Sequence, residues 1–251
     1  MEMKVTHIYH SGFYIELAQC AMLFDYYEGA LPPIRTDMPL YVFASHVHQD
    51  HFSFSVFTKE ELRAHPHVFY ILSNDIKRKY NRNFFLHQGV TNEQYERIIF
   101  VKTGEEVLVG KGNGPDGQDS SLLCIRTLRS TDAGVAFVVE AGERHIFHAG
   151  DLNWWTWEGE SEEDARGMEC AYKGEIEKLS GERMDLACLP LDGRQGEKFA
   201  LGFDFFMRHV ETAHAYPMHY WDDEAVVDRL LSLPCSEPYR DRIVRGAELL
   251  L

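Results

Sequence analysis

Four side chains that can bind a metal ion lie within six consecutive residues: His46, His48, Asp50 and His51. Imidazole and carboxylate groups are ligands suited to zinc, iron or manganese. Residues two apart in an extended segment point the same way, which puts His46 and His48 on one side. The chain can then turn, so that Asp50 and His51 face a second position nearby. The segment therefore predicts a loop that binds one or two metal ions, with a metal-free histidine-rich surface loop as the alternative.

The elements around this cluster suggest how it is positioned. The run 40–44 is short and continuously apolar, which predicts a buried strand directly before the cluster. Apolar runs and turn residues predict further strands over 5–17 (broken near 11–12), 21–25, 67–72, 97–101, 106–109, 122–128, 135–141, 145–149, 185–191 and 214–218. Helices are expected over 57–65, 75–82, 161–179, 198–209 and 223–233, a loop over 110–120 and an edge strand within 242–251.

The organisation of the chain points to an α/β fold. Strands dominate the first half, both halves contain helices, and no repeat, low-complexity segment or linker interrupts the 251 residues. Two packed sheets with helices on their outer faces would use all of these elements. We therefore expect one domain over residues 1–251.

The spacing HxHxDH at 46–51 resembles the signature of the metallo-β-lactamase superfamily. The segment 8–13 (IYHSGF) is similar to the first strand of the ascorbate-lactonase-like branch of that family. The resemblance implies a four-layer αββα sandwich with metal ions at the edge where the two sheets meet. It also implies that Asp151, in the run HAGD, bridges two ions and that His219, after a short strand, is the last ligand. The second site would then contain Asp50, His51, Asp151 and His219.

Two further residues resemble supporting parts of the family's site. Asp25 ends the run Leu23-Phe24-Asp25, which resembles the strand end whose aspartate supports a ligand. Histidines bound to a metal usually donate their second N–H to a carboxylate or carbonyl group, which fixes the ring. We expect Asp25 and His10 in this supporting role, with an ordinary hydrogen-bonded histidine as the alternative for His10.

The sequence departs from the family in one place. Most members carry another histidine before the hairpin that precedes the bridging aspartate, but residues 129–134 read RSTDAG. Thr131 lies closest to the expected position, and Asp132 beside it could substitute as an oxygen ligand. Without Asp132, the first site keeps three ligands plus water, which is a normal catalytic zinc arrangement. Such a site would bind more weakly, prefer a harder metal or stay vacant. Its three remaining ligands are His46, His48 and Asp151.

Tryptophans follow the bridging aspartate directly, at Trp154, Trp155 and Trp157. Apolar walls with few polar groups are typical of pockets for small molecules. The alternative is that these side chains pack the next helix onto the sheet. We expect at least one tryptophan in each role.

Composition and charge limit the partners. Apolar residues make up 45% of the chain, as in soluble globular proteins. The net charge of -15 argues against a nucleic-acid partner, which normally requires an electropositive face. The basic run 76–82 is interpreted as solvated surface, with a phosphate-binding patch as the alternative. Five scattered cysteines, no apolar leader and no long apolar stretch predict a cytoplasmic protein with no membrane partner.

These features predict a metal-dependent hydrolase with one or two zinc ions, or manganese or iron in their place. A metal ion lowers the pKa of bound water to about 7, so hydroxide can attack a small ester, lactone or phosphodiester at neutral pH. Asp50 could orient the nucleophile or accept its proton, and His219, Tyr220 or a loop residue could act as the acid. An RNA-processing nuclease fits the acidic chain less well. The main alternative is a metal-binding sensor or scaffold without turnover, and nothing in the sequence fixes the oligomeric state.

Overall fold

Two large β-sheets form the centre of the protein. The computed structural model describes residues 2–110, 112–113, 119–120 and 123–251. One sheet has seven strands in the order β15-β1-β2-β3-β4-β5-β6, and the other has six in the order β14-β13-β12-β11-β10-β7. The first contains β15 (Glu248–Leu250), β1 (Lys4–Tyr9), β2 (Gly12–Glu16), β3 (Ala21–Phe24), β4 (Leu40–Ala44), β5 (Val68–Ser73) and β6 (Ile98–Val101). The second contains β14 (Glu211–Met218), β13 (Arg183–Pro190), β12 (Arg144–His148), β11 (Val135–Ala141), β10 (Leu123–Arg129) and β7 (Glu106–Val109).

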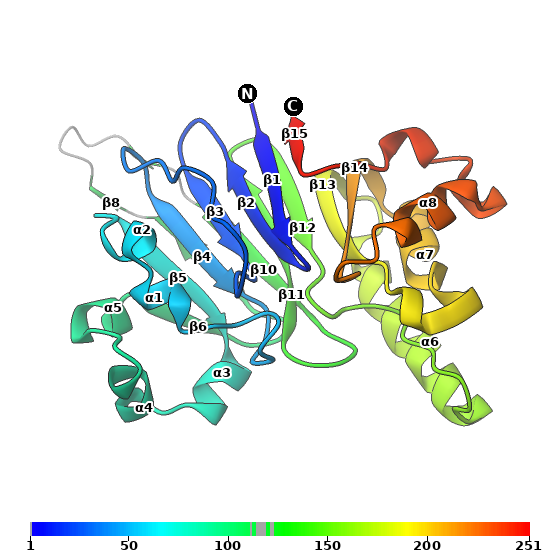
Figure 1. Ribbon diagram of the computed structural model, residues 1–251, viewed down its shortest axis with the longest axis horizontal. Helices are drawn as coiled ribbons and strands as arrows, with labels where there is room; N and C mark the ends of the chain where they lie inside the picture. Colours follow the sequence, from blue (N-terminus) through cyan, green and yellow to red (C-terminus); the bar gives the residue numbers. More distant parts are fainter. Residues whose placement is uncertain (1, 111, 114–118, 121–122) are drawn as a thin grey trace.

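Helices cover the outer face of each sheet, so the fold has four layers (Figure 1). The first sheet carries α1 (Ser55–Thr58), α2 (Glu60–Arg63), α3 (Asn74–Lys79), α4 (Arg82–His87) and α5 (Asn92–Glu96). The second carries α6 (Glu162–Ile176), α7 (Leu201–His209) and α8 (Ala225–Ser232). Short 3-10 helices η1 (Glu177–Leu179), η2 (Gly193–Lys198), η3 (Pro234–Ser236) and η4 (Arg240–Arg242) and a small pair, β8 (Gly112–Asn113) with β9 (Asp119–Ser120), complete the described elements. This is the αββα arrangement expected from the sequence.

Alternation along the central strands divides the apolar side chains between two cores. On β4, Tyr41 and Phe43 face the core between the sheets, whereas Val42 belongs to the core beneath α1–α5. Because successive side chains of a strand point to opposite faces, a strand covered on both faces needs a continuous apolar run. Between the sheets, the rings of Phe24 and Phe43 stack with centroids 4.4 Å apart. The run 40–44 therefore forms a strand that is buried on both sides.

Strand direction brings distant parts of the sequence to one edge. In the first sheet β1, β3, β4 and β5 share one direction, and in the second β10, β12, β13 and β14 do. Ligands in open α/β sheets bind outside the carboxyl ends of such strands. His10 and Asp25 directly follow β1 and β3, and the 46–51 cluster begins two residues after β4. Asp132, Asp151, Asp192 and His219 each lie within three residues of the ends of β10, β12, β13 and β14.

The strands predicted from the sequence are confirmed with small shifts, but several helices differ. The helix expected over 57–65 is two short helices, because Lys59 between them is extended, with ψ at 132°. The helix expected over 75–82 ends at Lys79, and α4 and α5 were not predicted. The helix expected over 198–209 is α7, which begins three residues later at Leu201, and Lys198 instead ends η2. The helix expected over 161–179 forms α6 and η1, and Ser161 caps α6 by accepting a hydrogen bond from the Asp164 amide.

Three remaining expectations concern the loop, the tail and the membrane. Most of the predicted loop over 110–120 lies outside the described residues, apart from Gly110 and the short β8 and β9. The tail contributes β15, which pairs with β1 at the edge of the first sheet. No helix in the described part of the chain is both long and apolar enough to cross a bilayer.

Candidate metal centre

The carboxylate of Asp151 lies at the centre of a buried histidine cluster. Its Oδ1 is 3.1 Å from Nε2 of His51 and 3.3 Å from Nε2 of His219, and its Oδ2 is 3.2 Å from Nε2 of His46. All four side chains are buried. One carboxylate therefore faces three imidazoles that come from two sheets, which is the placement that the sequence predicted for a bridging ligand.

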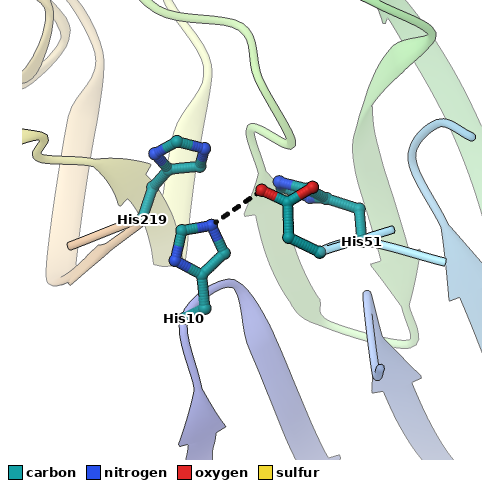
Figure 2. A group of neighbouring side chains, drawn as sticks. His10, His51 and His219 are labelled. Atoms are coloured by element: carbon teal, nitrogen blue, oxygen red, sulfur yellow. Dashed lines mark ion pairs between the residues drawn. The ribbon is translucent and has the colours of Figure 1, made fainter. Parts of the chain in front are cut away.

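A second set of ligand atoms adjoins this centre. Nε2 of His10 lies 3.5 Å from Oδ2 of Asp50, and the ring centroids of His10 and His219 are 4.3 Å apart. Figure 2 shows His10, His51 and His219 converging from separate segments on one space, with the His10–Asp50 pair dashed. Ligand atoms of His10, Asp50, His51 and His219 lie within 4.8 Å of one another, as metal ligands do. His10, expected as a support, thus lies within reach of an ion itself.

A third set includes Asp132, which the sequence analysis considered as a substitute ligand. Nδ1 of His48 is 3.7 Å from Oδ2 of Asp132, and ligand atoms of His48, Asp132 and Asp151 lie within 4.8 Å of one another. The hydroxyl of Thr131 instead donates to the backbone oxygen of Asn153 at 2.6 Å and accepts from the Asn153 amide at 3.0 Å. Thr131 therefore fixes the loop after Asp151, and Asp132 is the side chain that reaches toward the ligands.

Asp25 supports the 46–51 loop from the side of the His51 ring that faces away from Asp151. Its Oδ2 lies 2.7 Å from Nδ1 of His51, and it accepts hydrogen bonds from the amide of Ser45 at 2.7 Å and the Ser45 hydroxyl at 2.6 Å. That hydroxyl is 2.9 Å from Nδ1 of His46. A carboxylate behind a ligand ring sets its tautomer and orientation, so Nε2 of His51 is left to face Asp151. The placement agrees with the supporting role expected for Asp25.

A second supporting carboxylate, Asp192, was not predicted. Its Oδ2 lies 3.3 Å from Nδ1 of His219, on the side of the ring away from Asp151. Burial would raise the pKa of Asp192, but His219 and then Arg194 outweigh burial and lower it. The sequence offered only a partial signal: Asp192 directly follows the strand predicted over 185–191.

His148, for which the sequence indicated no role, connects the two sheets. It is fully buried, and its Nε2 lies 2.9 Å from the backbone oxygen of Ser11 in the turn between β1 and β2. Its Nδ1 accepts a hydrogen bond from the amide of Gly150 at 3.2 Å. His148 therefore orients the backbone directly before Asp151.

Backbone strain is concentrated at the site. Among the described residues, the non-glycine residues with φ between 41° and 65° are His10, Asp25, His219 and Trp221. A left-handed backbone costs such residues about 1–3 kcal/mol each, and it typically marks functional positions. At His219 it follows the turn out of β14, where the His219 amide donates to the His10 backbone oxygen at 3.1 Å. The first sheet thereby fixes the last predicted ligand.

Gly134 allows the β10–β11 hairpin to approach the metal-binding loop. Its φ is 66°, and a Cβ there would lie 2.0 Å from the backbone oxygen of Ser45 and 2.5 Å from Cβ of His46. The amide of Val135 donates to that same oxygen at 3.0 Å. Only glycine permits this contact, which also brings Asp132 within reach of His48.

Proton equilibria at the cluster follow from its packing. Burial lowers the pKa of His51, but the carboxylates of Asp151 and Asp25 outweigh it and raise the pKa well above 6.5. Burial raises the pKa of Asp151, but the charges of the facing His51 and His46 rings reverse this and lower it far below its usual range. Burial lowers the pKa of His10 to about 4, so this ring is neutral near pH 7. The proton of His51 therefore occupies a ring nitrogen that would have to be free to bind a cation.

The donor set fits a divalent cation. Among the described residues, buried atoms without a hydrogen-bond partner include Nε2 of His10, His46 and His51 and Oδ1 of Asp151. Leaving a buried polar atom unsatisfied costs about 1–3 kcal/mol, so such a group requires an explanation. Four of these atoms in one place, of the types that zinc, manganese and iron accept, are explained by a bound ion.

A cavity of 280 Å³ opens onto the cluster. Trp155 and Trp157 line it, whereas Trp154 packs near Tyr172 and Phe205 beneath α6 and α7. The tryptophans thus divide between pocket and core, as expected. The Tyr220 hydroxyl lies 3.3 Å from Nδ1 of His7, in a neighbouring cavity. The pocket lining is His48, Asp50, Thr131, Asp132, Asp151, Trp155, Trp157, Met168, Arg194, His219 and Trp221.

Comparison with known proteins rests on structure. No family model matches the sequence, and no curated protein matches it. The chain is similar to Igni18, a novel metallo hydrolase from the archaeon Ignicoccus hospitalis KIN4/I, with a TM-score of 0.60 and 14% identity over 100% of this chain and 99% of that one. It is also similar to YhfI, a metallo-β-lactamase fold protein from Bacillus subtilis, with a TM-score of 0.56 and 11% identity over 100% and 99% of the two chains.

A third solved structure differs in size and chemistry. CmlA, a diiron beta-hydroxylase from Streptomyces venezuelae, has a TM-score of 0.62 and 11% identity over 99% of this chain but 54% of its own. The present chain therefore spans about half the length of CmlA. Together with the two sheets, their order and the outer helices, these likenesses show that the chain has the metallo-β-lactamase fold.

Proposed function

We propose that the protein is a metal-dependent hydrolase that acts on a small ester, lactone or phosphodiester. The observation that carries this proposal is the set of unpartnered, buried Nε2 atoms of His46 and His51 around the carboxylate of Asp151. The metallo hydrolase Igni18, whose fold and length the chain shares, supports hydrolysis as the type of reaction.

Two ion positions would share Asp151. The first would use His46 and His48, with Asp132 supplying the ligand that the family's missing histidine would have provided. The second would use Asp50, His51 and His219, and His10 is close enough to join this set. Asp25 and Asp192 would hold the rings of His51 and His219 from behind.

The donor set bears on the choice of metal. Zinc accepts imidazole and carboxylate ligands in catalytic sites, and we propose it as the first candidate. Asp132 in place of a histidine makes the first position richer in oxygen, which favours a harder metal such as manganese or iron. CmlA, which has the same fold, is a diiron protein, so iron belongs in any test.

The pocket residues would assist the reaction in defined ways. A bound divalent cation supplies a Lewis acid and makes water acidic enough to react near pH 7. Burial raises the pKa of Asp50, but His10 and His51 outweigh burial and lower it, so its carboxylate is ionised and can orient the attacking water. Trp155 and Trp157 cover one side of the cavity and reduce the access of bulk water.

The test combines metal content with turnover. The purified protein is analysed for zinc, manganese and iron, and it is then assayed on bis(p-nitrophenyl) phosphate, an aryl ester and a lactone with each metal added. We expect bound metal and turnover of at least one substrate class. Bound metal without turnover on any of them would favour a sensor or scaffold instead, and a protein that binds no metal would contradict both.

A further inference from the structure

Two tryptophan side chains are exposed to solvent at the opening of the cavity beside the histidine cluster. Among the described residues, the large hydrophobic side chains that are exposed include Trp157, at 45%, and Trp221, at 38%. Both line this cavity. Trp157 stacks on Trp155 with an interplanar angle of 5°, and the Trp221 ring lies against His10 with centroids 4.1 Å apart and a tilt of 37°, so both rings are held in place. Fixed, exposed aromatic faces beside a site indicate a ligand that covers them.

One arginine stands beside these rings. Among the described residues, Arg194 is the single arginine or lysine that lines the cavity, and the lining also presents Asp50, Asp132 and Asp151. Its guanidinium carbon lies 5.9 Å from the centre of the Trp157 ring, and 58% of its side chain is exposed. A positive group with an aromatic face beside it recognises an anionic group attached to a ring.

Two of the three guanidinium nitrogens of Arg194 already donate hydrogen bonds within the protein. Nε and Nη2 donate to the carboxylate of Asp192, with Nε 2.9 Å from Oδ1. No hydrogen bond of Nη1 is found within the described part of the chain. Asp192 also receives the amide of Arg194 at 3.0 Å and lies beside His219, so it does not depend on the arginine side chain alone. The contact with Asp192 therefore fixes the guanidinium and leaves its outer edge to a ligand.

We propose that Arg194 and Trp157 bind the non-reacting end of the pocket's ligand, and that this end is an anionic oxygen group, a carboxylate or a phosphate, carried on an aromatic ring. If the proposed hydrolase function holds, this ligand is the substrate, and the bond to be cleaved faces Asp151 and the histidines. The distance between the guanidinium and the indole requires the anionic group and the ring to be adjacent in the ligand.

The test measures binding to the metal-loaded protein by calorimetry, with the metal content of each variant checked. The probes are phenylphosphonate and benzoate, which distinguish the two anions, and benzyl alcohol as a neutral ring. Arg194→Gln is expected to weaken the better anionic probe roughly ten- to hundredfold and to leave benzyl alcohol unchanged. Trp157→Ala is expected to weaken all three probes about two- to tenfold.

Two control variants make the same kinds of substitution outside the cavity. Arg183 begins β13 at the end opposite Asp192, and Phe84 is an exposed aromatic residue on α4. Arg183→Gln and Phe84→Ala should bind all probes as the unaltered protein does. Unchanged anion binding in Arg194→Gln would overturn the proposal, and so would loss of metal in that variant, which would make the arginine a positioning residue for Asp192. If the unaltered protein binds no metal, the hydrolase proposal fails, but the arginine effect on phenylphosphonate is still measurable.

Discussion

Oδ2 of Asp25 lies 2.7 Å from Nδ1 of His51, and both side chains are fully buried at the interface of the two sheets. This contact fixes the imidazole so that its other nitrogen faces Asp151 at 3.1 Å. Because Asp25 also receives both the amide and the hydroxyl of Ser45, one carboxylate positions the whole start of the metal-binding loop.

Asp25→Asn should therefore weaken metal binding without changing any direct ligand. Loss of such a supporting carboxylate typically reduces metal affinity 10- to 100-fold, and we expect an effect in that range. Affinity is measured by competition with a chromophoric chelator. Asp185→Asn removes a carboxylate on β13 of the second sheet that pairs with Arg144 at 3.2 Å outside the cluster, and it should leave the affinity unchanged. Equal affinities for the two variants would contradict the role given to Asp25.

His48→Ala should remove turnover and lower the bound metal while the protein stays folded. The side chain of His48 is 49% exposed, so its truncation opens no cavity in the core. The measurements are elemental analysis, a thermal melt and the assay that shows activity in the unaltered protein. His67→Ala, at another exposed histidine, serves as the control. Full turnover in His48→Ala would show that the site is assigned wrongly.

Asp132→Ala should lower the number of bound ions from two to one. The expected reason is loss of the oxygen ligand that faces His48, while the set at Asp50, His51 and His219 stays intact. Asp132→His should keep both ions and shift the preference toward zinc, since it exchanges a hard oxygen ligand for imidazole. Metal stoichiometry is compared after dialysis against limiting metal. A ratio that does not move in Asp132→Ala would exclude this residue as a ligand.

Metal binding should release protons near pH 7. Burial lowers the pKa of His51, but Asp151 and Asp25 raise it well above 6.5, so the metal-free ring is protonated at neutral pH. The proton must leave before Nε2 can bind a cation, so affinity should rise with pH until the raised pKa of His51 is passed. Calorimetry at pH 7 in two buffers of different ionisation enthalpy measures the release. The same binding enthalpy in both buffers would show that no proton is displaced.

Gly134→Ala should destabilise the protein and disturb the metal site together. The added Cβ would lie 2.0 Å from the backbone oxygen of Ser45, and φ at this position is 66°. Strain and overpacking together should lower the free energy of unfolding by at least about 2 kcal/mol. Gly104→Ala is the matched control, because its φ is 72° but nothing lies within 4 Å of the added atom. Urea unfolding should therefore separate the two variants, and equal losses would mean that the close approach at Ser45 is unimportant.

The sequence was sufficient for the parts of this site that depend on local spacing. The 46–51 cluster follows an apolar strand, and the HAGD run and His219 follow strands that could be recognised from their composition. Asp132 could be named because the resemblance defined a position where a ligand was missing. The four layers followed from the alternation of strands and helices, which the two cores confirm on β4.

Other features depend on contacts between segments that are distant in sequence. Asp192 supports His219 only because β13 and β14 are parallel neighbours, and strand order cannot be read from composition. His10 reaches the ligands because its backbone is left-handed, at φ 53°, which no local pattern indicated. The break at Lys59 was likewise not indicated locally, because the run 57–65 has helical spacing throughout.

A crystal structure of the purified protein, with anomalous scattering recorded at the zinc, iron and manganese edges, tests the central claim most directly. We predict an anomalous peak between Asp151 and the Nε2 atoms of His46 and His51, with a second peak beside Asp50 and His219 when both positions are filled. A metal-supplemented crystal with no anomalous peak within bonding distance of Asp151 would contradict the account.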